Sequence, residues 1–391
     1  MKKFFFVALS ATLLAAGCQK TEILNPVGGP SMSFSTGMGK ITKSVGTADA
    51  EAAGLKNLEA QDFSVWAYAD PDSDFASSTV VDENTKIYDG IENLLVKCTA
   101  ASKDAVVDNT ETPEDETAAA VAGTWVTEQE YFWPGDGKDL RFFAVSADGD
   151  WLRPASGTCP VEINYTAPSL DIKNFVVRAE KVGDKTPANE DLMVADFIKQ
   201  NQGKKVVDLK FRHTLSKIEF VFKTLAAGTG ETAPTVYVQS LKVEDLQNKG
   251  DLAVTKDATA ADVVWKYDWT NDTESIADFT DDWSETVTYA ETVEEAAKTD
   301  NTAMLLTTEA KTFATWLMLP QTITGKKVEI TYIINNRQFT SVFPIDNSEI
   351  NLTKWTYNQH IKYTITLAPN VISFNPSVED WATAQDIAQT N

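Results

Sequence analysis

Histidine is scarce in this chain of 391 residues, which contains only His213 and His360. A Ser/His/Asp or Cys/His catalytic site would need one of them. His213 continues an alternating apolar face, which predicts a buried residue at the end of a strand, and His360 opens a strand and is predicted to lie in a turn or at a rim. Carboxylates are too abundant for a catalytic pair to be chosen among them. The sequence therefore predicts no enzyme and no catalytic residues.

Signals for metals and cofactors are also missing. Asp70 to Asp74 begins like a calcium-binding loop, but Phe75 stands where such a loop needs Gly, and Val81 stands where it needs Glu. No segment has the form of a Gly-rich phosphate-binding loop. We therefore predict neither a metal site nor a cofactor.

Basic residues are few compared with acidic ones. The chain has 34 Lys and Arg against 57 Asp and Glu, so its formal net charge is −23. Nucleic acids are bound by basic surfaces, and anionic lipid surfaces attract clustered Lys and Arg. The acidic balance argues against both partners and is typical of a soluble surface that avoids unspecific association.

Cysteine occurs only at Cys18, Cys98 and Cys159. Neither Cys98 nor Cys159 has a second Cys or a His at the spacing of a metal site. In an exported protein these two could form a disulfide, or they could be two separate, small buried side chains. The sequence leaves both alternatives open.

Long hydrophobic runs are limited to Phe4–Ala16, which is shorter than the about 20 residues that span a bilayer. Two lysines precede the run and small residues end it, so residues 1–17 are predicted to be a secretory signal peptide. The sequence Leu-Ala-Ala-Gly-Cys at its end resembles the lipobox of bacterial lipoproteins. That resemblance implies that Cys18 is lipidated and anchors the protein to a membrane. The alternative is an ordinary signal with a chance cysteine.

Alternation of apolar and polar residues is clearest in the second half of the chain, at 207–211, 328–334 and 361–367. A period of two indicates strands with one buried face, as in antiparallel sheets. Segments 63–68 and 140–145 are strand-like but apolar on both faces. Such short runs separated by turn residues predict an all-β fold with two sandwich domains in tandem.

A polar segment near Gly203 precedes the clean alternation and predicts a domain boundary there. The expected organisation is a signal peptide at 1–17, a lipid tether with the first strand at 18–46, and domains at 47–203 and 204–391.

Several motifs, in the same order along the chain, resemble those of fimbrillin-like proteins, the type V pilins of the Mfa/fimbrillin family. The most specific is the strand pair that begins Leu-Lys-Phe-Arg-His-Thr-Leu-Ser-Lys-Ile at Leu209. The others are Tyr131–Pro134 with Leu140–Ala144, Asp191–Ala195, Met318–Gln321 and the closing segment from Trp355 to Trp381.

This resemblance implies two transthyretin-like β-sandwiches in an exported lipoprotein displayed on the outer membrane. In such pilins a trypsin-like protease removes the lipidated N-terminal segment together with the first strand. The C-terminal strand of another subunit then fills the open groove by β-strand addition. The implied partners are other fimbrial subunits and, through the lipid, the outer membrane, and the implied role is a fimbrial subunit that serves adhesion.

Segments suited to these roles are present. Ser31–Thr36 is the expected first strand, and Lys40 and Lys43 follow it in a Gly-flanked loop as candidate cleavage sites. Both terminal strands could equally complete their own domains. Processing sites in the family are often Arg, so the lysines leave open a cleaved stalk subunit or a lipid-retained anchor. The expected donor side chains are Ile372, Phe374, Val378 and Trp381.

The aromatic residues suggest a second function, that of a surface lipoprotein that binds glycans. Such a site needs exposed, coplanar rings. Most Trp and Tyr residues lie inside apolar runs, which favours core packing and sheet faces over a sugar-binding platform.

Overall fold

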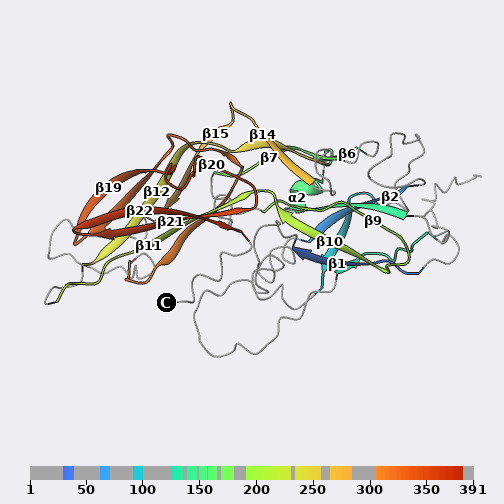
Figure 1. The fold of residues 1–391 in the computed structure, drawn as a ribbon, viewed down its shortest axis with the longest axis horizontal. Helices are drawn as coiled ribbons and strands as arrows, with labels where there is room; N and C mark the ends of the chain where they lie inside the picture. Colours follow the sequence, from blue (N-terminus) through green and yellow to red (C-terminus); the bar gives the residue numbers. More distant parts are fainter. Residues whose placement is uncertain are drawn as a thin grey trace, which may run out of the picture.

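The computed structural model consists almost entirely of β-strands (Figure 1). Within the described residues, the single helix is the short α2 (Gly149–Leu152). The prediction of an all-β fold is therefore confirmed. The structure describes residues 30–38, 62–70, 91–99, 125–134, 139–147, 149–155, 157–164, 169–179, 191–229, 234–256, 265–283 and 305–381.

Eight strands form a sheet that closes on itself, here called the ring. Their order is β2-β3-β4-β1-β10-β8-β5-β9, and the free edge of β2 pairs with β5, which closes the sheet. β9 is attached to β5 beside β8. The strands are β1 (Ser33–Met38), β2 (Phe63–Asp70), β3 (Leu94–Cys98), β4 (Trp125–Thr127), β5 (Asp139–Ser146), β8 (Met193–Ala195), β9 (Ile198–Gln200) and β10 (Val206–His213).

Strands β2 and β5 are apolar on both faces because each separates two hydrophobic clusters. In β2, Phe63 and Val65 belong to the cluster inside the ring, whereas Trp66 and Tyr68 belong to a larger cluster outside it. Residues of β5 alternate between the same two clusters. A strand that is buried on both sides loses the polar face that normally marks its period.

The C-terminal part is a sandwich of two four-stranded sheets, ordered β16-β11-β21-β22 and β15-β12-β18-β19. Phe279 of β15 packs against Trp316 of β16, which shows that the two sheets face each other. The strands are β11 (Ser216–Lys223), β12 (Val236–Gln247), β15 (Ile276–Asp282), β16 (Lys311–Met318), β18 (Lys327–Ile334), β19 (Arg337–Pro344), β21 (Gln359–Ala368) and β22 (Val371–Asp380), with the short pair β17 (Gln321–Thr322) and β20 (Lys354–Trp355).

A further sheet, β14-β13-β7-β6, joins strands from both sides of Gly203. β10 also begins after Gly203 and still belongs to the ring, so the sheets change between His213 and Ser216. The polar segment is instead the turn between β9 and β10, where the Gly203 amide donates to the Asn201 side chain at 3.0 Å. The strands of the joining sheet are β6 (Val161–Asn164), β7 (Ser169–Val176), β13 (Lys249–Lys256) and β14 (Trp265–Asn271).

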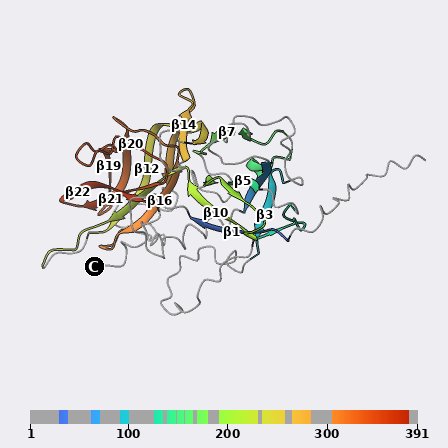
Figure 2. The ribbon, with the colours of Figure 1, turned by 45° about the vertical axis from the view of Figure 1, so that its right-hand side comes forward.

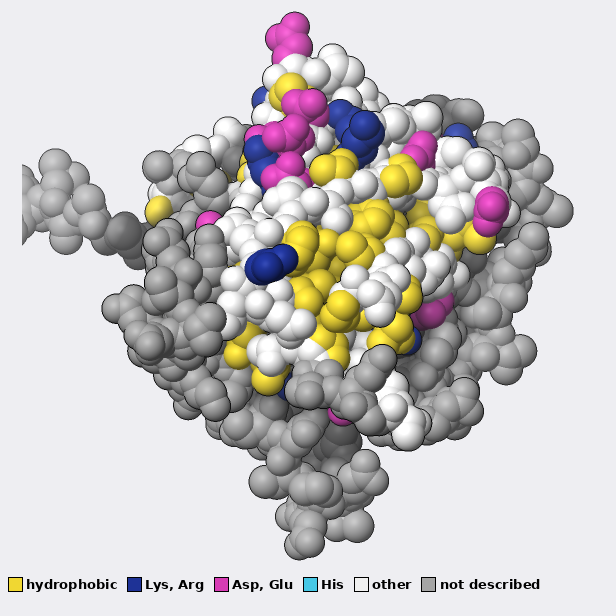
Figure 3. Space-filling view, turned by 90° about the vertical axis from the view of Figure 1, so that its left-hand side faces the viewer, with side chains coloured by type: hydrophobic (Ala, Val, Ile, Leu, Met, Phe, Trp, Pro, Cys, Tyr) yellow, Lys and Arg dark blue, Asp and Glu magenta, His cyan; other side chains and the backbone are white. Residues whose placement is uncertain are grey.

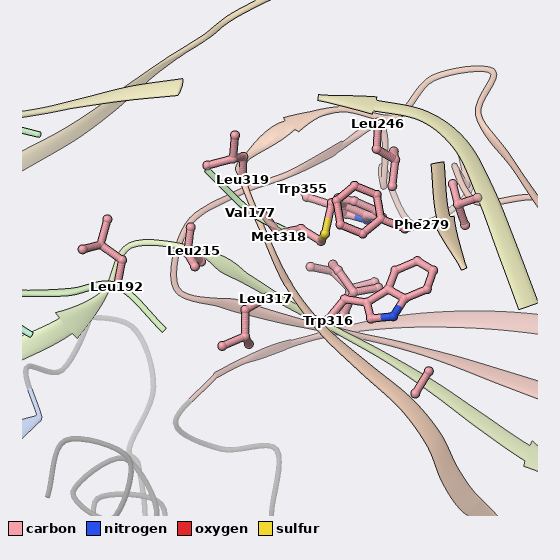
Figure 4. Packing of buried hydrophobic residues seen from close by; sticks show 14 of the residues in the cluster. Val177, Leu192, Leu215, Leu246, Phe279, Trp316, Leu317, Met318, Leu319 and Trp355 are labelled. Carbon is pink, nitrogen blue, oxygen red and sulfur yellow. The ribbon is translucent and has the colours of Figure 1, made fainter. Parts of the chain in front are cut away.

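The larger hydrophobic cluster extends from the outside of the ring into the sandwich. Figure 4 shows Trp316, Met318 and Trp355 packed together in the sandwich, with Leu215 and Leu192 continuing the cluster toward the ring. The two parts therefore share one apolar core and not only a linker.

The two remaining cysteines lie in different places and are not bonded to each other. Cys98 is buried in the ring cluster, and Cys159 packs against the larger cluster. Burial raises the pKa of the Cys159 thiol. Of the two alternatives, the structure therefore has two separate side chains and no disulfide between them.

Candidate functional site

The expected first strand is present as β1, shifted slightly from the predicted Ser31–Thr36 to Ser33–Met38. It lies beside β10 in both views of the ribbon (Figures 1 and 2). Cys18, Lys40 and Lys43, the predicted lipidation and cleavage residues, lie outside the described residues.

β1 fills a position between β4 and β10. It runs parallel to β10, with each residue from Ser33 to Met38 paired in register, and it meets β4 where Phe34 faces Trp125. Backbone hydrogen bonds extend this contact, because the Met32 amide donates to the Tyr131 carbonyl at 2.7 Å. β1 therefore has backbone partners on both of its sides.

Phe34 of β1, and Met32 just before the strand, are buried in the cluster inside the ring. Phe34 is 7% exposed, and its ring lies edge-on to Phe63 with centroids 6.3 Å apart. Phe63 also contacts Trp125 and Phe211, at 5.0 and 5.2 Å between centroids. The side chains that line this position are Trp125 and the inward residues of β10. They were not predicted as functional from the sequence, although the strict alternation at 207–211 indicated that one face of β10 is buried.

β22 occupies a different kind of position, the edge of its sheet. All 10 of its residues pair with β21, so it does complete its own domain in this structure. Ile372, Phe374 and Val378 lie opposite buried residues of β21 and thus share the inward face of the sandwich. Ile372 and Val378 are nevertheless 43% and 40% exposed.

The interior of the sandwich is incompletely covered where β22 faces β19. Phe374 stacks on Phe343 of β19, with centroids 5.2 Å apart and an angle of 5° between the rings, and on Tyr363 of β21 at 5.0 Å. Nearby on the same face of β19, opposite buried Tyr332, Phe339 is 43% exposed. Figure 3 shows hydrophobic side chains gathered across this end of the molecule. β22 is thus attached along one edge and partly uncovered on its apolar face.

Trp381, the fourth predicted donor residue, is placed differently from the other three. Its indole stacks on the imidazole of His213, with centroids 3.8 Å apart and an interplanar angle of 7°. His213 is buried at the end of β10, as predicted, and its Nδ1 lies 2.7 Å from Asp191 Oδ2. The end of β22 therefore contacts the ring.

His360 is also buried and lies within β21, so the prediction of a turn or rim position was wrong. Its Nε2 lies 2.6 Å from Glu219 Oε2, and its Nδ1 lies 3.8 Å from Glu379 Oε2 on β22. Burial alone raises the pKa of Glu219, but hydrogen bonds from His360 and Thr312, together with the charge of His360, lower it from 4.5 to about 2. Both histidines thus hold structural contacts beside β22.

A group of polar side chains, here called the joint, connects the ring with the joining sheet. The Arg212 guanidinium of β10 donates to both carboxylate oxygens of Asp196, at 2.8 and 2.9 Å, and the Tyr267 hydroxyl donates to Oδ1 at 3.2 Å. Burial lowers the pKa of Arg212, but Asp196 outweighs this effect and raises it. Burial and the charge of Asp196 raise the pKa of Tyr267 well above its usual value. Arg212 is therefore expected to stay charged, and Tyr267 to stay neutral, at neutral pH.

The sequence profile of a family described as fimbrillin-like matches residues 56–381, which is most of the chain. The chain belongs to the fimbrillin-like family. This membership confirms the prediction of a non-enzymatic structural protein, and it supports a fimbrial subunit that associates with other fimbrial subunits at the cell surface. No curated protein sequence matches the chain significantly.

Solved structures with a similar fold include a fimbrial protein from Bacteroides vulgatus and a fimbrial assembly protein from Parabacteroides distasonis. The first is 14% identical with a TM-score of 0.43, and the match covers 90% of this chain and 99% of that one. The second is 11% identical with a TM-score of 0.34, and the match covers 89% of this chain and 98% of that one.

Other kinds of site are not found in the described part of this fimbrillin-like chain. No group of His, Cys, Asp and Glu side chains there could hold a metal ion. No helix among those residues is long and apolar enough to cross a membrane. Phe339 is the one exposed aromatic side chain in the described ranges, so they present no pair of exposed coplanar rings of the kind that a glycan platform needs.

Proposed function

We propose that this fimbrillin-like protein is a fimbrial subunit that assembles by exchanging its terminal strands. The observation that supports this best is the contrast between β1, which fills a two-sided position in a closed ring, and β22, which is an edge strand with a partly uncovered apolar face. In this proposal β1 is removed and β22 of another subunit takes its place. The products are polymers joined by β-strand addition.

Removal of β1 would leave a position that favours the binding of another strand. Val207, Leu209 and Phe211 on β10 are fully buried in the ring cluster, and Trp125 faces Phe34 from the other side. Removal of β1 would expose these side chains and leave the adjoining edge of β10 without its ladder partner. Exposed apolar surface and an unpaired edge both favour the addition of another strand.

β22 has the pattern that such a position requires. Met32 and Phe34 are the inward residues of the segment that β1 provides, two positions apart. Ile372 and Phe374 have the same spacing on the inward face of β22, and Val378 extends the face. Side chains at every second position fix the register of an added strand, while the main chain provides the hydrogen bonds.

The order of segments suggests how β1 is released. Cys18 and β1 both precede Lys40 and Lys43 in the sequence. One cut at either lysine would therefore separate the lipid and β1 from the rest of the chain. A cleaved chain would act as a stalk subunit, and an uncleaved chain would remain an outer-membrane anchor that can supply β22 but cannot accept it.

The test of the donor assignment is the double variant Ile372→Asp/Phe374→Asp. Charges cannot enter an apolar groove without a large desolvation penalty, so polymer formation after cleavage should be lost while the monomer keeps its β-sheet circular dichroism spectrum. Val342→Asp, at an exposed position of the other edge strand, is the matched control and should polymerise normally. Polymers of wild-type length from the double variant would refute the assignment.

A further inference from the structure

The two ends of β22 are held in different ways. At its first residue, Val371 pairs with Ala368, and a two-residue turn connects β22 covalently to β21. At the other end, β22 leads into Trp381. A strand that is tied to its neighbour by a tight turn can leave the sheet only by separating from the opposite end. The contacts around Trp381 therefore control how easily β22 opens.

The contacts at this end reach beyond the sandwich to β10 of the ring. Trp381 lies flat on His213 at 3.8 Å between centroids, and His213 is itself fixed by Asp191 at 2.7 Å. The Trp381 amide also donates to the Asn358 carbonyl at 3.4 Å. Along the strand, by contrast, Ile372 and Val378 leave about two fifths of their surfaces exposed, at 43% and 40%.

Glu379 adds a second contact to the same end. It is paired with His360 across the ladder, and its Oε2 lies 3.8 Å from His360 Nδ1. The other ring nitrogen of His360 is bound to Glu219 of β11 at 2.6 Å. Lys362 approaches the same Glu219 oxygen at 3.9 Å, and Lys217 is paired with His360 across the β11–β21 ladder. The charges near His360 are therefore the carboxylates of Glu219 and Glu379 and the ammonium groups of Lys362 and Lys217. His360 thus bridges β11 toward β22.

We propose that Trp381 on His213, supported by Glu379 beside His360, forms a latch that holds β22 on its own subunit and sets the rate at which the strand opens. This inference rests on the proposed function, in which the opened β22 is the donor strand. The latch prevents premature exchange. Because His213 belongs to β10, the strand that holds β1, the acceptor position and the donor strand meet at one element.

The test is hydrogen exchange of the full chain followed by mass spectrometry. Trp381→Ala should increase the exchange rate of β22 amides by roughly tenfold, because a stacked aromatic pair and its buried area are lost at the opening end. Trp381→Phe keeps a ring on His213 and should restore most of the protection. Glu379→Gln should give a smaller increase. Val342→Ala, at an exposed position on the outer face of the opposite edge strand, is the control and should leave β22 unchanged.

Unchanged β22 exchange in Trp381→Ala would overturn the latch, whatever the variant does in assembly. An equal increase in β22 and in the central strand β12 would overturn it as well, since it would indicate general destabilisation. Faster β22 exchange without polymer formation after cleavage would leave the latch standing and would refute the strand-exchange function. The failure of the two proposals can therefore be distinguished.

Discussion

β1 and β22 each carry an inward aromatic side chain but occupy different environments. Met32 and Phe34 at β1, and Ile372 and Phe374 on β22, are pairs of apolar residues two positions apart. β1 has a strand on each side and its Phe34 is 7% exposed, whereas β22 has one neighbouring strand and its Ile372 is 43% exposed. The position of a strand in its sheet, more than its composition, therefore determines which one leaves a groove behind and which one can be exchanged.

The largest expected effect tests this difference directly. Phe34→Ala should lower the free energy of unfolding by about 3–5 kcal/mol, because loss of the large buried phenyl group leaves a cavity inside the closed sheet. Ile372→Ala should lower it by about 1 kcal/mol, since much of the side chain is already in water. Urea denaturation followed by tryptophan fluorescence measures both variants. Equal losses would show that β1 is held no more firmly than β22.

The next effect concerns the joint between the ring and the joining sheet. Asp196→Ala removes the acceptor of Arg212 and Tyr267 and should lower the free energy of unfolding by about 2 kcal/mol, because partly buried polar groups lose a charged partner. Glu329→Ala, at an exposed position on β18, serves as the comparison and should change little. Differential scanning calorimetry would reveal the change. Wild-type stability of Asp196→Ala would contradict a structural role for this joint.

A smaller effect is expected from acid. The pKa of Glu219 is lowered from 4.5 to about 2, so its contribution to stability is complete above pH 4.5 and is lost as the pH falls toward 2. Glu219→Gln should therefore flatten the loss of stability over this pH range. The exposed Glu329→Gln on β18 is the control. An unchanged acid profile of Glu219→Gln would show that the contact with His360 contributes no pH dependence.

The sequence was sufficient to predict the strands whose two faces differ in environment. Segments 207–211, 328–334 and 361–367 show the alternating pattern and are strands in the structure. β1 and β22 were also identified near their observed positions. In each case one face meets a hydrophobic cluster and the other meets water or a polar loop, so the period of two is visible in the sequence.

Contacts between distant segments could not be predicted in the same way. Nothing in the local pattern indicated that Trp381 stacks on His213, that β7 pairs with β13, or that β10 belongs to the ring. These arrangements depend on which sheet edges meet after folding. His360 was misplaced for the same reason, because it contacts Glu219 of β11, which lies 141 residues away in sequence.

The central claim is that the position of β1 accepts β22 of another subunit. The most direct test is brief trypsin treatment of the chain without residues 1–17, with a Lys40→Ala/Lys43→Ala variant as the uncut control, followed by sizing of the products. Strand exchange predicts cleavage after β1 and a ladder of oligomers from the wild-type chain, and monomers from the variant. Cleavage at Lys40 or Lys43 that yields only monomers would contradict it.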